Sequence, residues 1–171
     1  MATTANHERV DMVFSKAQLG ERAAYGRFLL AQAAAHLPTE QALEQGGIEE
    51  LVPDWTARRR AESLKADLRD LGLDLPAPAG APAFETREAQ LGALYVLEGS
   101  RLGGTLLKRS VPADFPSRFL GNVDSAAWQA LLARLDAALD SEDRRAAAIA
   151  GARQVFDLFE ASGRAYLDGD G

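Results

Sequence analysis

Tyr95-Val-Leu-Glu-Gly-Ser-Arg-Leu-Gly-Gly-Thr105 is the stretch of sequence that decides the fold assignment. Apolar residues at helical spacing run through it, which predicts a helix from residue 86 to just before Pro112. Each glycine inside a helix costs roughly 1 kcal/mol relative to alanine, so Gly99, Gly103 and Gly104 together cost about 3 kcal/mol. A helix that keeps them requires bare backbone there, for another helix, for a kink, or for a flat ligand against the main chain.

Composition and charge limit the class of protein. The 171 residues are enough for one domain, which we place over residues 1–171. No apolar run approaches the roughly 18 residues of a membrane helix, no secretory signal pattern is present, and cysteine is absent, so we expect a cytoplasmic protein without a membrane span. The net charge is −6 and the basic residues are scattered, which argues against nucleic acid as a partner.

The rest of the chain also has helical patterns. Alanine, leucine, arginine and glutamate dominate, and β-branched residues nowhere alternate with polar ones. We expect a loop over residues 74–84, which are rich in proline, and helices over residues 4–17, from 21 to a break at Pro38, from 39 to 46, from 54 or 56 to 71, from 124 or 125 to 139, and from 141 onwards. The predicted fold class is an all-α, single-domain helical bundle.

Few side chains could carry chemistry. His7 shares an apolar helix face with Val10 and Phe14 and lies one turn before Asp11. A histidine in this setting is more often a hydrogen-bonded core residue than a metal ligand. His36 lies at a predicted helix end, and we assign it a structural role. The sequence suggests no Ser-His-Asp set and no di-iron carboxylate pattern, so any catalysis should depend on a bound cofactor.

Two features together are compatible with a flat, iron-containing macrocycle. His7 could hold the iron from one side, while the glycine-containing helix lies against the other side. Phe14, Phe156 and Phe159 could form apolar walls around such a ring. The alternative from the residues alone is that the glycines serve helix packing and that His7 is a core residue.

Residues 91–107, Leu-Gly-Ala-Leu-Tyr-Val-Leu-Glu-Gly-Ser-Arg-Leu-Gly-Gly-Thr-Leu-Leu, resemble the distal helix of haem oxygenases, particularly the bacterial type associated with bacteriophytochromes. Residues 3–11, Thr-Thr-Ala-Asn-His-Glu-Arg-Val-Asp, resemble the proximal helix of the family, with His7 at the position of the iron ligand. Residues 60–68 are similar to a structural helix of the family, and residues 152–159 to its last haem-facing helix.

This resemblance implies that haem lies between a proximal helix and a kinked distal helix. Haem would be both cofactor and substrate, and its degradation with O2 would give biliverdin, carbon monoxide and ferrous iron. His7 would ligate the haem iron, and Asp11 would orient the imidazole directly or through water. Phe14 and Phe156 would contact the ring.

The resemblance assigns catalytic roles to the distal helix. The main chain of Gly99 and Ser100 would crowd bound dioxygen toward one meso carbon, and Gly103 and Gly104 would let the helix open and close. Ser100 stands where the animal-type enzymes carry an aspartate that anchors a water molecule. It can bind a water molecule but carries no charge.

Propionate binding departs from the family pattern. Gln129 and Ala133 lie near the positions of a lysine/arginine pair in the relatives. The remaining candidates for propionate contacts are Tyr95, Arg134 and Arg153.

The resemblance also implies partners. Electrons would come from an external reductase or ferredoxin, because the sequence has no flavin or nicotinamide motif. A bacteriophytochrome would receive the biliverdin, and we expect a monomer. Two alternatives stay open: a haem-binding carrier or sensor of the same fold without turnover, and a haem-free helical interaction module.

Overall fold

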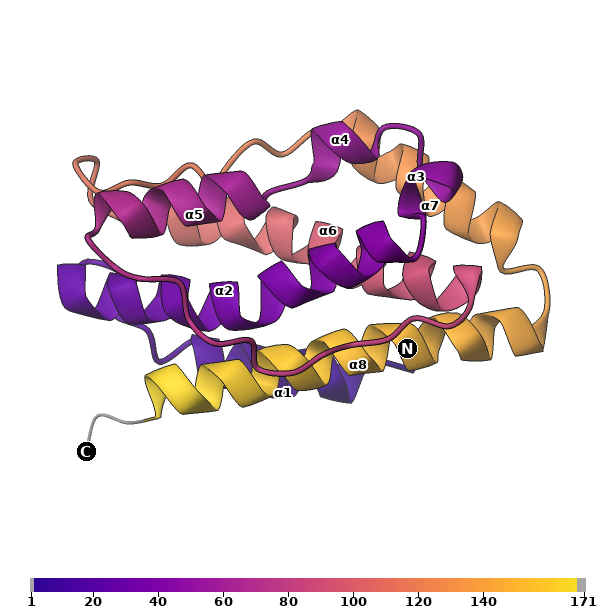
Figure 1. Cartoon of the computed structure of the whole chain (residues 1–171), viewed down its shortest axis with the longest axis horizontal. Coiled ribbons are helices and arrows are strands. Elements are labelled where there is room, and N and C mark those ends of the chain that lie inside the picture. The colour runs from indigo at the N-terminus through magenta and orange to yellow at the C-terminus, as the bar shows by residue number, and fades with distance from the viewer. Residues whose placement is uncertain (1, 169–171) are drawn as a thin grey trace.

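The structure is a computed structural model that describes residues 2–168. Its helices are α1 (Thr4–Phe14), α2 (Arg22–Gln45), α3 (Ile48–Leu51), α4 (Trp55–Arg58), α5 (Ala61–Asp70), α6 (Arg87–Lys108), α7 (Ser125–Ala138) and α8 (Glu142–Leu167) (Figure 1). Residues 2–168 contain no strand, which confirms the all-α prediction. No helix of this described part is both long and apolar enough to span a lipid bilayer.

Three helices begin where the sequence predicts, because a polar side chain caps the first turn of each. The caps are Thr86 for α6, Asp124 for α7 and Ser141 for α8, and each accepts a hydrogen bond from a backbone N–H two or three residues later. α1 is shorter than predicted and ends at Phe14. There the hydroxyl of Ser15 donates to the carbonyl of Met12 at 2.9 Å, and side-chain bonds of this kind compete with continued helix.

α2 continues through Pro38, where the sequence predicts a break. Proline has no N–H to donate to the carbonyl four residues earlier, which is that of Ala34. The Ala34 carbonyl instead accepts a hydrogen bond of 2.8 Å from the N–H of Ala79, in the loop between α5 and α6. The helix tolerates the proline because a segment distant in sequence satisfies the acceptor that the proline leaves free.

The single helix predicted for residues 54–71 is divided into α4 and α5. The division lies at Arg60, whose backbone N–H donates to a Glu40 carboxylate oxygen at 2.6 Å, while the N–H of Ala61 donates to the other oxygen at 2.9 Å. A carboxylate at this position satisfies free N–H groups and interacts favourably with the helix dipole. Because Glu40 belongs to α2, nothing in the segment itself indicates the cap.

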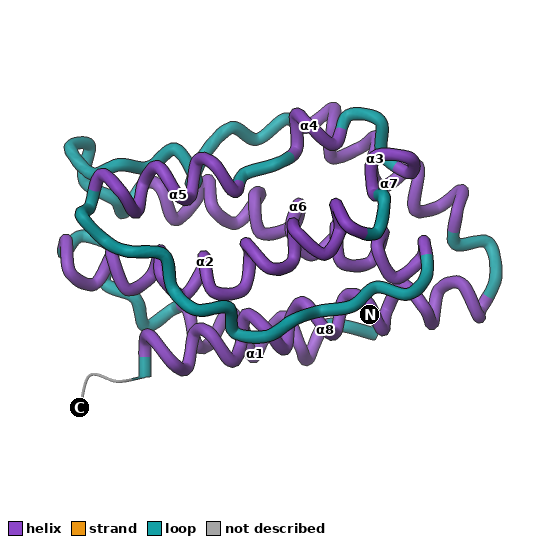
Figure 2. The backbone as a smooth tube through the Cα atoms, viewed as in Figure 1, coloured by secondary structure: helices purple, strands orange, loops and turns teal. Residues whose placement is uncertain are grey.

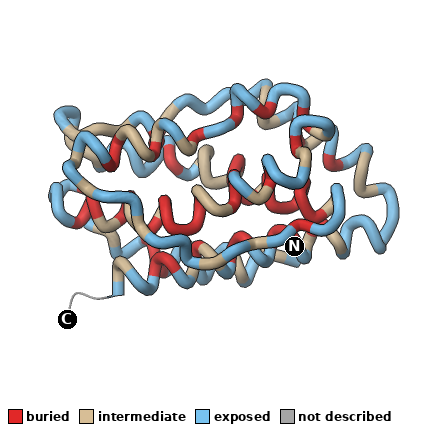
Figure 3. The backbone as a smooth tube through the Cα atoms, viewed as in Figure 1, coloured by how far each residue is buried: buried red, intermediate tan, exposed pale blue. Residues whose placement is uncertain are grey.

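The core lies between α2, α6 and α8, whose facing sides are buried (Figure 3). The predicted loop over residues 74–84 is confirmed as part of the long connection between α5 and α6 (Figure 2). This connection contacts α2 through Ala79 and α8 through Ala83, whose N–H donates to the Gln154 side chain at 3.3 Å. This connection therefore links α2 and α8 on the surface of the bundle.

α6 and α8 cross in backbone contact at two glycines. A Cβ atom added at Gly92 would overlap the carbonyl group of Ala148, and one added at Gly151 would overlap that of Ala89. Neither glycine belongs to the group that the sequence pattern singles out. Gly92 and Gly151 therefore serve the close packing of α6 against α8. This crossing determines the direction in which the C-terminal half of α6 extends from the core.

We expect Gly92→Ala and Gly151→Ala each to lower the free energy of unfolding by about 3 kcal/mol, the upper end of the usual range for overpacking. The added methyl group meets backbone atoms rather than a flexible side chain, so relief requires the two helices to separate. Urea denaturation of the variants measures the loss. Gly103→Ala is the matched control, because a Cβ there meets no described atom within 4 Å. Equal stabilities for all three variants would contradict the assignment.

Candidate functional site

The C-terminal half of α6 presents a face that the rest of the bundle does not cover. Gly99, Gly103 and Leu106 share this face, which we call the open face, because they lie four and three residues apart on one helix. A Cβ added at Gly99 or Gly103 meets no atom of the described chain within 4 Å. Leu106 is 63% exposed although it continues the apolar stripe of the helix. The open face thus combines bare main chain with an apolar side chain that lacks cover.

Gly104 has a different environment from the other two glycines of the motif. It is buried, and a Cβ there would lie 3.3 Å from the Leu120 side chain. It packs α6 against the segment that precedes α7. Close packing against the bundle therefore accounts for Gly104, whereas it does not account for Gly99 or Gly103.

His7 lies on α1 with its side chain 63% exposed, so it is not a core residue. Its Nδ1 atom is 3.1 Å from a carboxylate oxygen of Asp11, one turn further along the helix. This contact favours a proton on Nδ1 and leaves Nε2 as the nitrogen that can donate its lone pair. The imidazole also contacts Phe156 of α8 edge-on, with 6.0 Å between ring centres. The Asp11 and Phe156 contacts together fix the orientation of the ring.

A cleft of about 360 Å³ adjoins both of these features. It is lined mainly by apolar side chains of α6, α7 and α8, together with the charged side chains of Asp136 and Arg145 and with Thr3, which directly precedes α1. Thr3 lies one helical turn before His7, and its carbonyl accepts the His7 N–H at 3.0 Å. Tyr95, which also lines the cleft, lies one turn before Gly99 and stacks on Trp128 with 5.6 Å between ring centres. The cleft therefore lies next to both His7 and the open face.

Ser100 is held from behind by a buried arginine. The Arg60 side chain donates from Nη2 to the Ser100 hydroxyl at 2.8 Å and to the Leu97 carbonyl at 2.6 Å. The Ser100 hydroxyl in turn donates to the Leu97 carbonyl at 2.7 Å. Burial, and next the charge of Arg101, lower the pKa of the Arg60 guanidinium to about 10, so it remains charged at neutral pH. A fixed positive charge thus lies directly behind Ser100.

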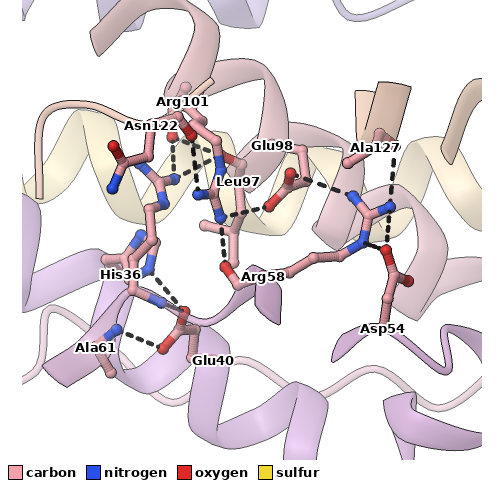
Figure 4. A network of polar contacts seen from close by, with 12 residues as sticks. His36, Glu40, Asp54, Arg58, Ala61, Leu97, Glu98, Arg101, Asn122 and Ala127 are labelled. Carbon is pink, nitrogen blue, oxygen red and sulfur yellow. Dashed lines mark hydrogen bonds and ion pairs between the residues drawn. The ribbon is translucent and has the colours of Figure 1, made fainter. Parts of the chain in front are cut away.

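Arg60 interacts electrostatically with Arg101 and Glu98, which belong to a larger polar network (Figure 4). Glu98 accepts from Arg58 at 3.3 Å and from Arg101 at 3.2 Å, and Arg58 also pairs with Asp54 at 2.8 Å. Sequence reasoning missed this network, because its members come from α4 and its N-cap residue, from α6, and from the segment between α4 and α5. The one available signal was three successive arginines at residues 58–60, of which two are buried.

His36 and Glu40 form a second buried contact, with 3.1 Å between Nε2 and Oε1, but without the alignment of a hydrogen bond. Burial lowers the pKa of the His36 imidazole below its usual value, so the ring is neutral in the folded protein. Burial opposes the charge of Glu40, but His36 and the N–H groups of Arg60 and Ala61 hold the pKa of its carboxyl below the usual value. The structural role predicted for His36 is consistent with its complete burial at this position.

This contact predicts how stability depends on pH. Below about pH 6.5 the unfolded chain protonates His36 but the folded protein does not, so the free energy of unfolding falls as the pH decreases. The slope due to His36 approaches about 1.4 kcal/mol per pH unit. We expect His36→Leu to flatten the urea-derived stability profile between pH 7 and 5 relative to that of the wild type. Parallel profiles for wild type and His36→Leu would contradict the prediction.

The remaining predicted site residues lie in several environments. Phe14 is 9% exposed and packs against Phe28 and Phe159, so it belongs to the core beneath α1. Arg134 donates to the Leu51 carbonyl of α3 at 3.4 Å, and Arg153 donates to the Ala2 carbonyl at 3.2 Å. Neither arginine is among the residues that line the cleft. Their roles as propionate contacts stay predictions.

Two similar proteins carry the name haem oxygenase. The chain is 36% identical over 129 residues to the heme oxygenase of Xanthomonas campestris pv. campestris (strain 8004), an alignment that covers 66% of this chain and 78% of that protein. It is 30% identical over 172 residues to the heme oxygenase PigA of Pseudomonas aeruginosa, covering 93% and 86% respectively. No family model matches the chain. The chain belongs to the haem oxygenase family.

The fold leads to the same family. The structure superimposes on that of the NO- and CO-bound heme oxygenase from Neisseria meningitidis with a TM-score of 0.84, and the sequences are 25% identical. The match covers 99% of this chain and 91% of the other. The predicted haem-oxygenase-like bundle is therefore confirmed, and the comparison extends over both α1 and α6.

The residues of this haem oxygenase fold fit a haem. The open face offers bare main chain for a flat ring, and the exposed His7 offers Nε2 for an iron atom. The apolar cleft lies beside both features. Of the predicted residues, the structure thus places His7 beside Asp11 and Phe156, and Gly99 beside Gly103, in positions that suit one ligand.

Proposed function

We propose that this protein is a haem oxygenase in which haem binds between His7 and the open face of α6. The observation that carries the proposal is the open face itself, since a Cβ at Gly99 or Gly103 would meet no atom of residues 2–168 outside its own helix backbone within 4 Å. Helix packing, the alternative role for these glycines, is found at Gly92 and Gly151 instead. The exposed histidine with one nitrogen engaged by Asp11 supports the same ligand.

The chain's own residues position and orient the substrate. When bound, haem supplies the iron that activates dioxygen and is itself the molecule that is degraded. Asp11 holds Nδ1 of His7, so Nε2 would be the neutral nitrogen available to hold the haem iron. Both side chains are largely exposed, so the carboxylate acts on the imidazole through a solvent-screened contact. A weak contact of this kind orients the ring without giving it the character of an imidazolate.

The distal side depends on Ser100 and Arg60. The hydroxyl of Ser100 is fixed between Arg60 and Leu97, which leaves its second lone pair for a water molecule on the ligand side. The Arg60 charge behind it stabilises negative charge on nearby oxygen atoms, while the remaining lone pair of the hydroxyl can accept a hydrogen bond from that water molecule. Arg60 is therefore a positioning residue that acts through Ser100, and it supplies the charge that the serine lacks.

The co-reactants follow from the chemistry of the proposal. Haem degradation to biliverdin, carbon monoxide and ferrous iron consumes O2 and electrons, and we propose that a separate reductase or ferredoxin supplies the electrons. A bacteriophytochrome is the proposed acceptor of biliverdin. We place the reaction in the cytoplasm.

A single spectroscopic experiment tests the function. The purified protein is mixed with haem, and then a chemical reductant and air are added. We expect a histidine-ligated haem spectrum that gives way to a green pigment absorbing red light. A haem spectrum that persists through reduction and aeration would indicate a carrier or sensor, and an unchanged haem spectrum on mixing would indicate a module that binds no haem. Either result would overturn the proposal.

Ser100→Ala tests the distal arrangement. The change keeps the helix but removes the acceptor of the Arg60 bond, and a hydrogen bond to a charged group contributes about 1.5 kcal/mol or more. We expect single-turnover haem degradation to slow about tenfold, while the haem dissociation constant stays within about twofold. Thr105→Ala on another face of α6 is the control. A rate unchanged from wild type would show that Ser100 has no part in the reaction.

A further inference from the structure

A cavity of about 290 Å³ lies between α4, α5, α6 and the segment that precedes α7, and we call it the arginine cavity. The α6 residues that line it, Glu98 and Arg101, lie on a different side of the helix from Gly99 and Gly103. Five arginines and three carboxylate side chains line the arginine cavity, an excess of positive charge in a chain whose net charge is −6. We propose that it binds a small oxyanion of the phosphate class.

The carboxylates around the arginine cavity are already engaged. Three of the five arginines have ion pairs that neutralise them: Arg58 with Asp54 at 2.8 Å, Arg59 with Glu44 at 3.1 Å, and Arg118 with Asp70 at 2.6 Å. Asp124 accepts the first N–H groups of α7. Glu98 is shared between Arg58 at 3.3 Å and Arg101 at 3.2 Å (Figure 4). Arg60 and Arg101 therefore keep more positive charge than the carboxylates around them offset.

Arg60 is the stronger indication of a missing anion. It is 5% exposed, yet it forms no ion pair with any carboxylate of residues 2–168. In this part of the chain its hydrogen bonds engage Nη2, with two acceptors of α6, and its charge lies 4.7 Å from the centre of the Phe119 ring. A buried charge without an ion pair is unfavourable, and a guanidinium has five N–H donors. An anion in the cavity would receive the donors that remain.

Arg101 has an unmet donor as well. Its Nε atom is buried and has no hydrogen-bond partner in the described chain, which costs free energy relative to a paired donor. The guanidinium groups of Arg60 and Arg101 also repel each other: after the larger effect of burial, the charge of Arg101 lowers the pKa of Arg60. An anion that accepts from both side chains satisfies free donors and offsets this repulsion.

The donors around the cavity favour an anion with several oxygen atoms. Guanidinium groups bind phosphate through parallel N–H bonds to separate oxygen atoms, which a chloride ion does not have. Ser63 of α5 lines the cavity and adds a hydroxyl donor. At the rim, a Cβ added to Gly121 would lie 2.8 Å from Nζ of Lys108, so an ammonium group is close to the opening. The volume suits a single small ion rather than a macromolecule.

Occupancy of the arginine cavity has a consequence for the distal side of the proposed haem site. The Nη2 atom of Arg60 donates to the Ser100 hydroxyl, and the same guanidinium lines the cavity. An anion bound to it offsets the positive charge behind Ser100, which stabilises negative charge on nearby oxygen atoms. Phosphate should therefore slow haem degradation. This consequence rests on the proposed function, whereas binding of the anion does not.

Calorimetric titration of the apoprotein with sodium phosphate, at an ionic strength held constant with sodium chloride, tests the site. We expect a dissociation constant of about 1 mM or below for the wild type. Arg101→Gln should weaken binding about tenfold, and Ser63→Ala, which leaves the charges intact, about threefold. The matched control is Arg69→Gln, which removes an exposed arginine of α5 outside the cavity and should bind phosphate as the wild type does. Circular dichroism of each variant reports whether the fold is retained.

The absence of phosphate binding to the wild type would overturn the proposal, and so would equal affinity in the wild type, Arg101→Gln and Ser63→Ala. Chloride that competes with phosphate at equal concentration would overturn the assignment to an oxyanion.

Single-turnover haem degradation then tests the link to Ser100. Saturating phosphate should slow the wild type about threefold or more and leave the rate of Arg101→Gln unchanged. Phosphate that binds without any effect on the wild-type rate would overturn this link. A protein that binds phosphate but not haem would instead overturn the proposed function and leave the anion site standing.

Discussion

Gly103→Leu should yield a folded protein that no longer binds haem. An added side chain at this position meets no described atom within 4 Å, so the apoprotein can accommodate it without strain. Leucine also has a higher helix propensity than glycine, by up to about 1 kcal/mol, so the free energy of unfolding should stay equal or rise. The leucine side chain would occupy the space in which we place the ring. We expect the haem dissociation constant to increase by at least about a hundredfold, equivalent to about 2.8 kcal/mol.

Two measurements on the same sample separate this outcome from general damage. Urea denaturation of the apoprotein reports its stability, and titration with haem followed by absorbance reports binding. Thr105→Leu is the matched control, because it adds a leucine to an exposed position on another face of α6. Wild-type affinity in Gly103→Leu would show that the ring does not lie against this part of α6. Loss of both stability and binding would show that the open face is covered in solution.

The sequence predicted those elements of the fold that depend on local interactions. The starts of α6, α7 and α8 follow from Thr86, Asp124 and Ser141, because each cap acts within its own first turn. The predicted helix boundaries are wrong where a residue distant in sequence determines whether the helix continues. α2 passes through Pro38 because Ala79 bonds the freed carbonyl, and α4 and α5 are separate because Glu40 of α2 caps the second of them.

The glycines of the candidate site also show that sequence patterns do not reveal contacts between segments distant in sequence. The pattern identified Gly99, Gly103 and Gly104 as a group, but the structure separates them into two exposed to open space and one packed on Leu120. Gly92 and Gly151, which have the closest backbone contacts, carried no signal because their partners are on another helix. Periodicity identifies a helical glycine, whereas only the tertiary structure shows whether protein or open space lies next to it.

The polar contacts around the site are of two kinds: those within one helix, which the sequence predicts, and those between segments distant in sequence, which it does not. His7 and Asp11 are four residues apart on one helix, and their contact could be predicted from that spacing alone. The bond between Arg60 and Ser100 joins residues forty positions apart, and this arginine is buried although it is the last of three successive arginines. The sequence therefore indicated the proximal residues of the site, while the charge behind Ser100 emerged only from the packing of α6 against the segment that precedes α5.

His7→Ala should abolish the histidine-ligated haem spectrum and stop haem degradation. The side chain is largely exposed, so its loss should change the free energy of unfolding by no more than about 0.5 kcal/mol. The effect on turnover should exceed a hundredfold, because the substituted protein retains no side chain at the iron position that we assign. Asp11→Asn is the companion variant: it keeps the ligand and alters only the contact at Nδ1, so ligation should persist with a modest change in rate.

Added imidazole makes the test of His7 specific. A free imidazole fits the volume left by the histidine side chain, and it should restore both the ligated spectrum and part of the turnover in His7→Ala. Rescue of this kind requires that the histidine acts as an iron ligand, since a histidine that only packed against Phe156 would not be replaced by a soluble base. A ligated spectrum that survives in His7→Ala without imidazole would place the iron at another residue. In that case α1 would only cover the bundle, and the open face of α6 would require a ligand held in another way.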